Sequence, residues 1–182
     1  MKYCLFLAAM TAMHAQAQVH PDLGGDGVWL PKNVADMGSS ANVPFQPWAK
    51  AKFQENSGKQ SETDRRCLPP GVPRIMFQAR PFEIVQSANR ILFLYEGGAH
   101  VWRQVWMDAR DHPKDPNPDW LGHSIGHWDG DTLVVDTVGF NDRTWLDDAG
   151  RSHTEQLHVI EKLTKTGSAA MKYEVVIDDP GA

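Results

Sequence analysis

The chain has 182 residues, a formal net charge of −5 and 41% hydrophobic residues. This length suffices for one domain with a hydrophobic core of its own. Because the charge balance is acidic and no extended run of Lys and Arg occurs, we expect neither a nucleic-acid partner nor an anionic membrane partner.

The first seventeen residues have the form of a secretory signal peptide. Lys2 precedes an almost wholly apolar stretch over residues 4–13, and Ala15-Gln16-Ala17 follows as an A-x-A cleavage site. The apolar stretch is too short to cross a bilayer as a helix. We therefore expect cleavage after Ala17, no stable membrane insertion, and a mature protein that is periplasmic or extracellular.

Residues 18–75 are predicted to form an irregular N-terminal arm. Pro, Gly, Ser and Asn recur at short intervals, and the proline-rich stretch over residues 68–73 cannot hold regular structure. A short helix is expected over residues 47–53. Once the signal peptide is removed, Cys67 is the one remaining cysteine, so packing and not a disulfide must hold the fold.

Residues 76–182 are predicted to form an all-β, antiparallel domain. Apolar, β-branched and aromatic runs are each bounded by turn residues and follow one another without intervening helices. We expect an antiparallel meander that closes into a lipocalin-like barrel, with an open sandwich as the alternative. Gly27-Val28-Trp29 has the G-x-W form that opens the first strand of such barrels. The predicted strands are residues 82–86, 91–95, 100–107, 122–128, 132–138, 157–164 and 171–177.

One hairpin predicts a specific pair of side chains. Asp129-Gly130 has the form of a two-residue turn between alternating strands, and this register places His123 directly opposite Asp136. In a meander, the connections alternate between the two ends of the sheet, so the long connections 108–121 and 139–156 would gather at the end where this pair lies. Function tends to lie on long loops over a rigid scaffold. The sequence therefore predicts a functional rim there.

The residue types at this rim suit acid–base chemistry. A histidine beside a carboxylate can exchange a proton, because the carboxylate fixes the tautomer and stabilises the charged imidazole. We expect His123, oriented by Asp136, to transfer protons, with Asn141 and His158 as further catalytic residues that position the substrate. The alternative is that Asp136 and Asn141 only cap turns. Four more residues are predicted to contact the substrate: Trp120, Asp142, His153 and Glu155.

Three functions fit this rim. The first is a cofactor-independent enzyme, a lyase, isomerase or hydrolase, that acts on a small organic or sugar-like molecule. The second is a non-catalytic ligand-binding barrel with tryptophan walls. The third is a metal-dependent enzyme that uses the same His, Asp and Glu side chains for a divalent metal. No H-E-x-x-H or comparably dense motif occurs, so no metal ligand is assigned.

Residues 122–142, GHSIGHWDGDTLVVDTVGFND, form the most distinctive run of the chain. Together with residues 67–71 and 174–180, this run resembles a family of secreted bacterial proteins that has no established activity. The resemblance covers most of residues 67–180 and implies a common fold, but it carries no catalytic residues over. It also implies that related chains continue beyond Pro180.

Overall fold

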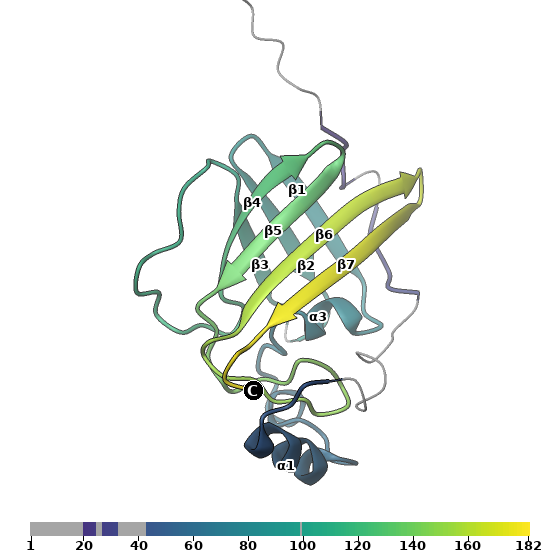
Figure 1. Ribbon diagram of the computed structural model, residues 1–182. Helices are drawn as coiled ribbons and strands as arrows, with labels where there is room; N and C mark the ends of the chain where they lie inside the picture. The colour runs from purple at the N-terminus through teal and green to yellow at the C-terminus, as the bar shows by residue number, and fades with distance from the viewer. Residues whose placement is uncertain (1–19, 25–26, 33–42, 99) are drawn as a thin grey trace, which may run out of the picture.

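The computed structural model describes residues 20–24, 27–32, 43–98 and 100–182. The expected signal peptide, residues 1–17, lies outside the described residues. The described chain is dominated by one strongly curled seven-stranded sheet (Figure 1). Among the described residues, no helix is long and apolar enough to span a membrane.

All seven predicted strands are present, with small differences at their ends. Their sequences are rich in β-branched and aromatic residues, which pack well on a pleated surface. The strands are β1 (Phe82–Ser87), β2 (Arg90–Tyr95), β3 (Trp102–Trp106), β4 (His123–Asp129), β5 (Thr132–Val138), β6 (His158–Gly167) and β7 (Ala170–Asp178).

The sheet is a curled half-barrel, with its strands in chain order from β1 to β7 (Figure 1). In the described part of the chain, β1 and β7 are not paired with each other, so the pairing leaves the barrel open. The G-x-W segment does not add a full eighth strand. Trp29 makes one isolated antiparallel bridge to Phe82 at the start of β1.

The prediction that all neighbouring strands run antiparallel is wrong at one place. β3 and β4 are parallel, with Val105 paired to Ser124 and Trp106 to Ile125. Parallel neighbours require the chain to return along the whole sheet before the second strand begins. Residues 107–122 make this return as the long loop at the left of Figure 1. The two long connections therefore do not gather at one end: the first runs the length of the sheet.

Alternation along the strands separates an inner face from an outer face. On β5, Leu133, Val135 and Thr137 are fully buried, whereas Asp136 between them is partly exposed. Successive side chains of a strand point to opposite faces, so the buried set lies inside the curl and Asp136 lies outside. The core inside the curl includes Phe93, Val105, Leu133, Val135, Val159 and Leu163.

In its described residues the N-terminal arm holds two helices, a third crosses its predicted end at residue 75, and the arm lies toward one end of the sheet (Figure 1). The predicted helix at residues 47–53 is confirmed and extends further, starting with Pro47 in the first turn, where proline is well tolerated. Asn56 donates from Nδ2 to the carbonyl of Gly150 at 2.9 Å, which ties this helix to the connection between β5 and β6. Residues 68–73 form no helix or strand, as predicted. The helices are α1 (Pro47–Asn56), α2 (Glu62–Arg65) and α3 (Arg74–Phe77).

Candidate functional site

The turn between β4 and β5 lies one residue later than predicted, which shifts the pairing of the two strands by two residues. Asp129 pairs with Thr132, so the turn consists of Gly130 and Asp131 and not of Asp129 and Gly130. Gly130 has φ +58 at the first position of this turn. A two-residue hairpin with glycine first is a form that matches the twist of the strands, and this glycine therefore sets the register.

The predicted direct opposition of His123 and Asp136 is wrong for this reason. His123 pairs with Val138, and Asp136 pairs with Ile125. A shift of two residues keeps each side chain on its face, because the side-chain period of a strand is two. His123 and Asp136 therefore share the outer face of the sheet, but in the described chain no hydrogen bond joins them directly.

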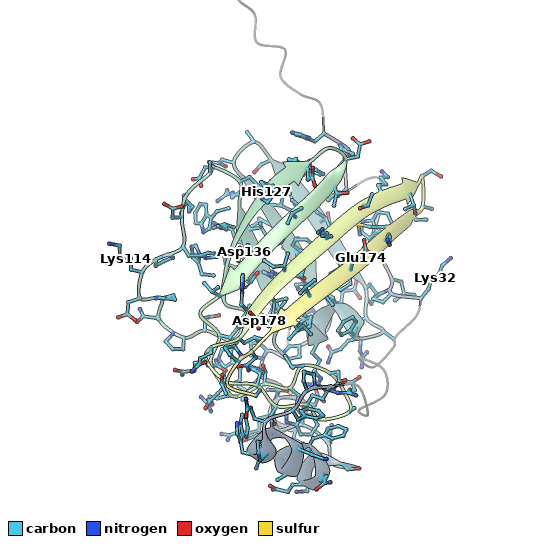
Figure 2. The ribbon with its side chains drawn as sticks, in the orientation of Figure 1. Lys32, Lys114, His127, Asp136, Glu174 and Asp178 are labelled. Carbon is cyan, nitrogen blue, oxygen red and sulfur yellow. The ribbon has the colours of Figure 1, made fainter. Side chains whose placement is uncertain are left out.

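A histidine outside the strands joins them. His112, in the long connection between β3 and β4, has its Nδ1 2.9 Å from Nδ1 of His123 and its Nε2 3.1 Å from Oδ1 of Asp136. On the other side, Nε2 of His158 on β6 lies 2.8 Å from the same Asp136 oxygen. We call these four residues the outer-face cluster. Figure 2 shows Asp136 on the front of the sheet, and Lys114 marks the loop that brings His112 to it.

Solvent reaches part of the outer-face cluster. The side chains of Asp136 and His158 are 33% and 39% exposed, and that of His112 is 19% exposed. Partial burial lowers the pKa of His123, and the nearby His112 and Arg110 lower it further. Arg110 is held by stacking on Trp106, with its guanidinium carbon 3.6 Å from the ring centre. The surroundings of His123 therefore favour its neutral form, and the side chains of Asp136 and His158 are accessible to solvent.

The long connection between β3 and β4 is also attached to the sheet near its second end. Near the other end, the backbone N–H of Asp119 donates to the carbonyl of Gly139 at 2.9 Å, and Asn141 donates back to the carbonyl of Asp119 at 2.8 Å. Gly139 has φ +73, and a Cβ there would come within 3 Å of Pro116. The glycine thus lets the loop lie close against the end of β5, which positions His112.

Other predicted site residues have local partners. Asn141 accepts at Oδ1 from the backbone N–H of Arg143 at 3.1 Å, which is the turn-capping alternative. His153 is 2% exposed and is held by Thr144 and by the carbonyl of Thr154. Since that carbonyl only accepts, Nδ1 of His153 carries the proton and Nε2 accepts from the Thr144 hydroxyl. His153 therefore serves the packing of the loop between β5 and β6.

The remaining predicted substrate contacts lie at the surface. Asp142 and Glu155 are exposed, and Trp120 is partly covered by the guanidinium of Arg143, 4.8 Å from its ring centre. Within the described residues, no hydrogen bond, ion pair or ring contact joins Asn141, His153 or these three side chains to the outer-face cluster. The structure thus brings together His123, Asp136 and His158 of the predicted set, and adds His112.

A second polar group, which we call the inner-face network, lies on the same strands inside the curl. Arg103 on β3 donates to Ser124 at 3.0 Å, to Thr137 at 2.7 Å, and to Glu161 on β6. The hydroxyl of Tyr173 on β7 donates to Glu161 at 2.9 Å. Burial and the adjacent Glu161 carboxylate raise the pKa of Tyr173 well above its usual value. The charges of Arg103 and Glu161 are both buried and are paired with each other. The residues of the network come from five strands, β3 to β7, so their hydrogen bonds link these strands across the inner face.

The residue types and hydrogen bonds of the outer-face cluster are of a kind that suits proton transfer. Among the described residues, no group of three or more His, Cys, Asp and Glu side chains is arranged to hold a metal ion. His112 directs its two nitrogens to two different partners, which suits a hydrogen-bonded chain. No protein-family model, curated protein or solved structure matches this chain. The geometry of the cluster is therefore the ground for a functional proposal.

Proposed function

We propose that this protein is an exported, cofactor-independent acid–base enzyme that acts on a small organic or sugar-like molecule at the outer-face cluster. One observation carries the proposal: His158 and His112 share one carboxylate oxygen of Asp136, whose side chain is partly exposed. Export is supported by the signal-peptide pattern of residues 1–17.

His158 is the base that this geometry favours. An ionised carboxylate can only accept, so Nε2 of His158 carries the proton that bonds to Asp136. The lone pair of the neutral ring is then on Nδ1, which has no partner among the described residues. When Nδ1 takes a proton from a substrate, the adjacent Asp136 carboxylate stabilises the imidazolium.

Turnover assays of three variants test this assignment. The substrates are a panel of small ketones, hydroxy acids, sugar lactones and esters, followed by NMR in D2O so that proton exchange is seen even without net reaction. We expect His158→Gln and Asp136→Asn to lower turnover by about 10²- to 10⁴-fold, the usual contribution of general acid–base catalysis. His127→Gln is the matched control, because His127 lies exposed on the same face of β4 outside the cluster.

Two results would overturn the proposal. One is a folded wild-type protein that shows neither turnover nor proton exchange with any member of the panel. The other is a His158→Gln variant that retains wild-type turnover. Equal losses in His127→Gln and His158→Gln would place the effect outside the cluster.

A specific feature favours a second function, the binding of a ligand without catalysis. A cavity of about 280 Å³ lies on the open side of the half-barrel, between the arm with Trp29 and the β6–β7 hairpin. Ligand sites are typically concave and mostly apolar, and this volume is near their lower limit. Its lining includes Trp29, Leu30, Met76, Phe82, Met171 and Tyr173.

Binding of an apolar fluorescent probe tests this second function separately. Met171→Trp places a larger side chain at an inner-face position of β7 that lines the cavity, so we expect probe affinity to fall at least tenfold while turnover at the outer-face cluster is unchanged. Lys172→Ala, in the same strand with its side chain exposed on the outer face, is the control. Equal probe affinity in wild type and Met171→Trp would contradict binding at this cavity.

A further inference from the structure

We infer that His112 and His123 form a second, proton-relaying arm of the outer-face cluster, so that the site has a basic nitrogen at each of two ends. This inference rests on the proposed function and narrows it. It assigns a role to a histidine in the β3–β4 connection and gives His123 a role different from that of a base paired directly with Asp136.

When the three histidines are neutral and Asp136 is a carboxylate, the hydrogen bonds allow one arrangement of the ring protons. Asp136 can only accept, so Nε2 of His112 carries a proton toward it, and Nδ1 of the neutral His112 ring must then be an acceptor. The Nδ1 atom of His123, 2.9 Å away, must be the donor. Since a neutral imidazole has one N–H, Nε2 of His123 keeps a free lone pair, and it has no partner among the described residues.

A proton arriving at one end can therefore move inward. When Nε2 of His123 takes a proton from a substrate, the Nδ1–H proton of His123 passes to Nδ1 of His112. His123 is then neutral again in its other tautomer, and His112 carries the charge beside the Asp136 carboxylate. Two N–H bonds form, at Nε2 of His123 and at Nδ1 of His112, while the N–H bond at Nδ1 of His123 and the substrate's bond to its proton break. The cluster gains one proton, the substrate keeps the electron pair, and no oxidant or further reactant is required.

The surrounding charges favour this direction of transfer. Arg110 and His112 face His123, and together with partial burial they disfavour positive charge on that ring. His112, in contrast, faces Asp136 at 3.1 Å, and His158 bonds to the same oxygen from β6. The positive charge is thus more stable on His112 than on His123.

The distance between His123 and His158 favours one class of reaction. His123 on β4 and His158 on β6 flank β5, so their backbones are roughly 10 Å apart at the normal spacing of two strands. With one proton on the chain, one end is an acid while the other end remains a base. That state suits isomerisation or elimination, in which a proton leaves one atom of the substrate and another returns to a different atom. Ester or lactone hydrolysis does not need it.

NMR of the histidine ring nitrogens tests the relay without any substrate. In the mature protein, at a pH where the histidines are neutral, we expect His123 to be protonated on Nδ1 and His112 on Nε2. We also expect a scalar coupling between their Nδ1 atoms across the hydrogen bond. His127, exposed and without a hydrogen-bond partner in the described chain, is the internal reference for an unconstrained tautomer. Wild-type His123 protonated on Nε2 would overturn the inference.

The variant His112→Phe keeps a ring in place but removes both nitrogens. We expect His123 to adopt the tautomer of His127 in this variant, and turnover to fall by about 10- to 100-fold with a shifted pH profile. An unchanged His123 tautomer, or an unchanged pH profile, would contradict the relay. If the variant does not fold, the tautomer of His123 in the wild-type spectrum is the test of the relay.

The substrate panel separates the failure of this inference from that of the proposed function. Turnover of esters and lactones alone, abolished in His158→Gln and unaffected in His112→Phe, would refute the relay and keep the acid–base enzyme. No turnover at all, with His123 protonated on Nδ1, would refute the enzyme and keep the hydrogen-bonded arm. Isomerisation or elimination that depends on both His158 and His112 is the result we expect.

Discussion

The strands β4, β5 and β6 carry a polar group on each face of the sheet, and the two groups differ in how completely their charges are paired. Inside the curl, Glu161 is 1% exposed and is matched by Arg103. Outside, the side chain of Asp136 is one-third exposed and hydrogen-bonds to the imidazole rings of His112 and His158. A buried charge is tolerated only when it is paired and hydrogen-bonded. The hydrogen-bonding groups of the inner group are therefore paired, whereas in the outer group Nε2 of His123 and Nδ1 of His158 have no partner among the described residues.

The largest effect that tests this comparison is on the inner face. Arg103→Met leaves Glu161 buried without its cation, and we expect a loss of about 3–5 kcal/mol in the free energy of unfolding. Urea denaturation followed by tryptophan fluorescence measures it. The double variant Arg103→Met/Glu161→Met removes both charges and should be more stable than Arg103→Met alone. A double variant less stable than either single one would show that the pair is not acting as a unit.

A buried histidine extends the comparison to pH. Burial lowers the pKa of His153 below its ordinary value of 6.5, although its bond to Thr154 acts in the opposite direction. Between the folded and the unfolded pKa the unfolded chain binds more protons, so the free energy of unfolding rises with pH there and falls as the pH drops below about 6.5. One such group contributes a slope of at most about 1.4 kcal/mol per pH unit.

Denaturation midpoints between pH 5 and 8 measure this slope. His153→Gln removes the titrating group, so its stability should depend less on pH over the same range than that of the wild type. His127→Gln, which removes an exposed histidine, serves as the control and should keep the wild-type slope. Identical slopes in wild type and His153→Gln would mean that His153 does not contribute.

A smaller effect is expected on the outer face. Asp136→Ala removes two hydrogen bonds, but its histidine partners are partly exposed and can bond to water. We expect a change of about 1 kcal/mol or less in the free energy of unfolding, in the range of exposed ion pairs. The comparison with Arg103→Met would fail if Asp136→Ala destabilised the fold equally, because the outer-face cluster would then be structural.

The smallest effect concerns a pair that is exposed on both sides. On β7, Nζ of Lys172 lies 2.9 Å from Oε1 of Glu174, and both side chains are more than half exposed. Solvent and salt screen such a pair, so Lys172→Ala should change the free energy of unfolding by less than about 0.5 kcal/mol. The same urea titration, at low and at high salt, measures it. A larger loss that vanishes at high salt would indicate a wider charge network on this face.

Much of the fold was predictable because its signals are local. Each strand of the sheet is a run of apolar and β-branched residues bounded by turn residues, and the helix that begins at Pro47 has a proline in its first turn. Period-two alternation also placed His123 and Asp136 on one face, and a register error of two residues did not change this. His158, which was assigned to the same rim, hydrogen-bonds to Asp136.

The rest depended on contacts between distant segments. A meander and a sheet with one parallel pair have the same strand sequences, so the crossing of residues 107–122 could not be read from the strand pattern. His112 was missed for this reason, since only the path of that loop brings it to Asp136. The buried pair of Arg103 and Glu161 was missed because the two residues are 58 positions apart.

By itself, the sequence determined that residues 82–178 form seven strands and which side chains of neighbouring strands share a face, because both follow from local composition and the two-residue period of a strand. The tertiary structure decided which strands are neighbours, in which direction, and which loop residue completes the outer-face cluster. Those choices follow from burying one face of every strand at once, and that energy belongs to the whole sheet and not to any segment.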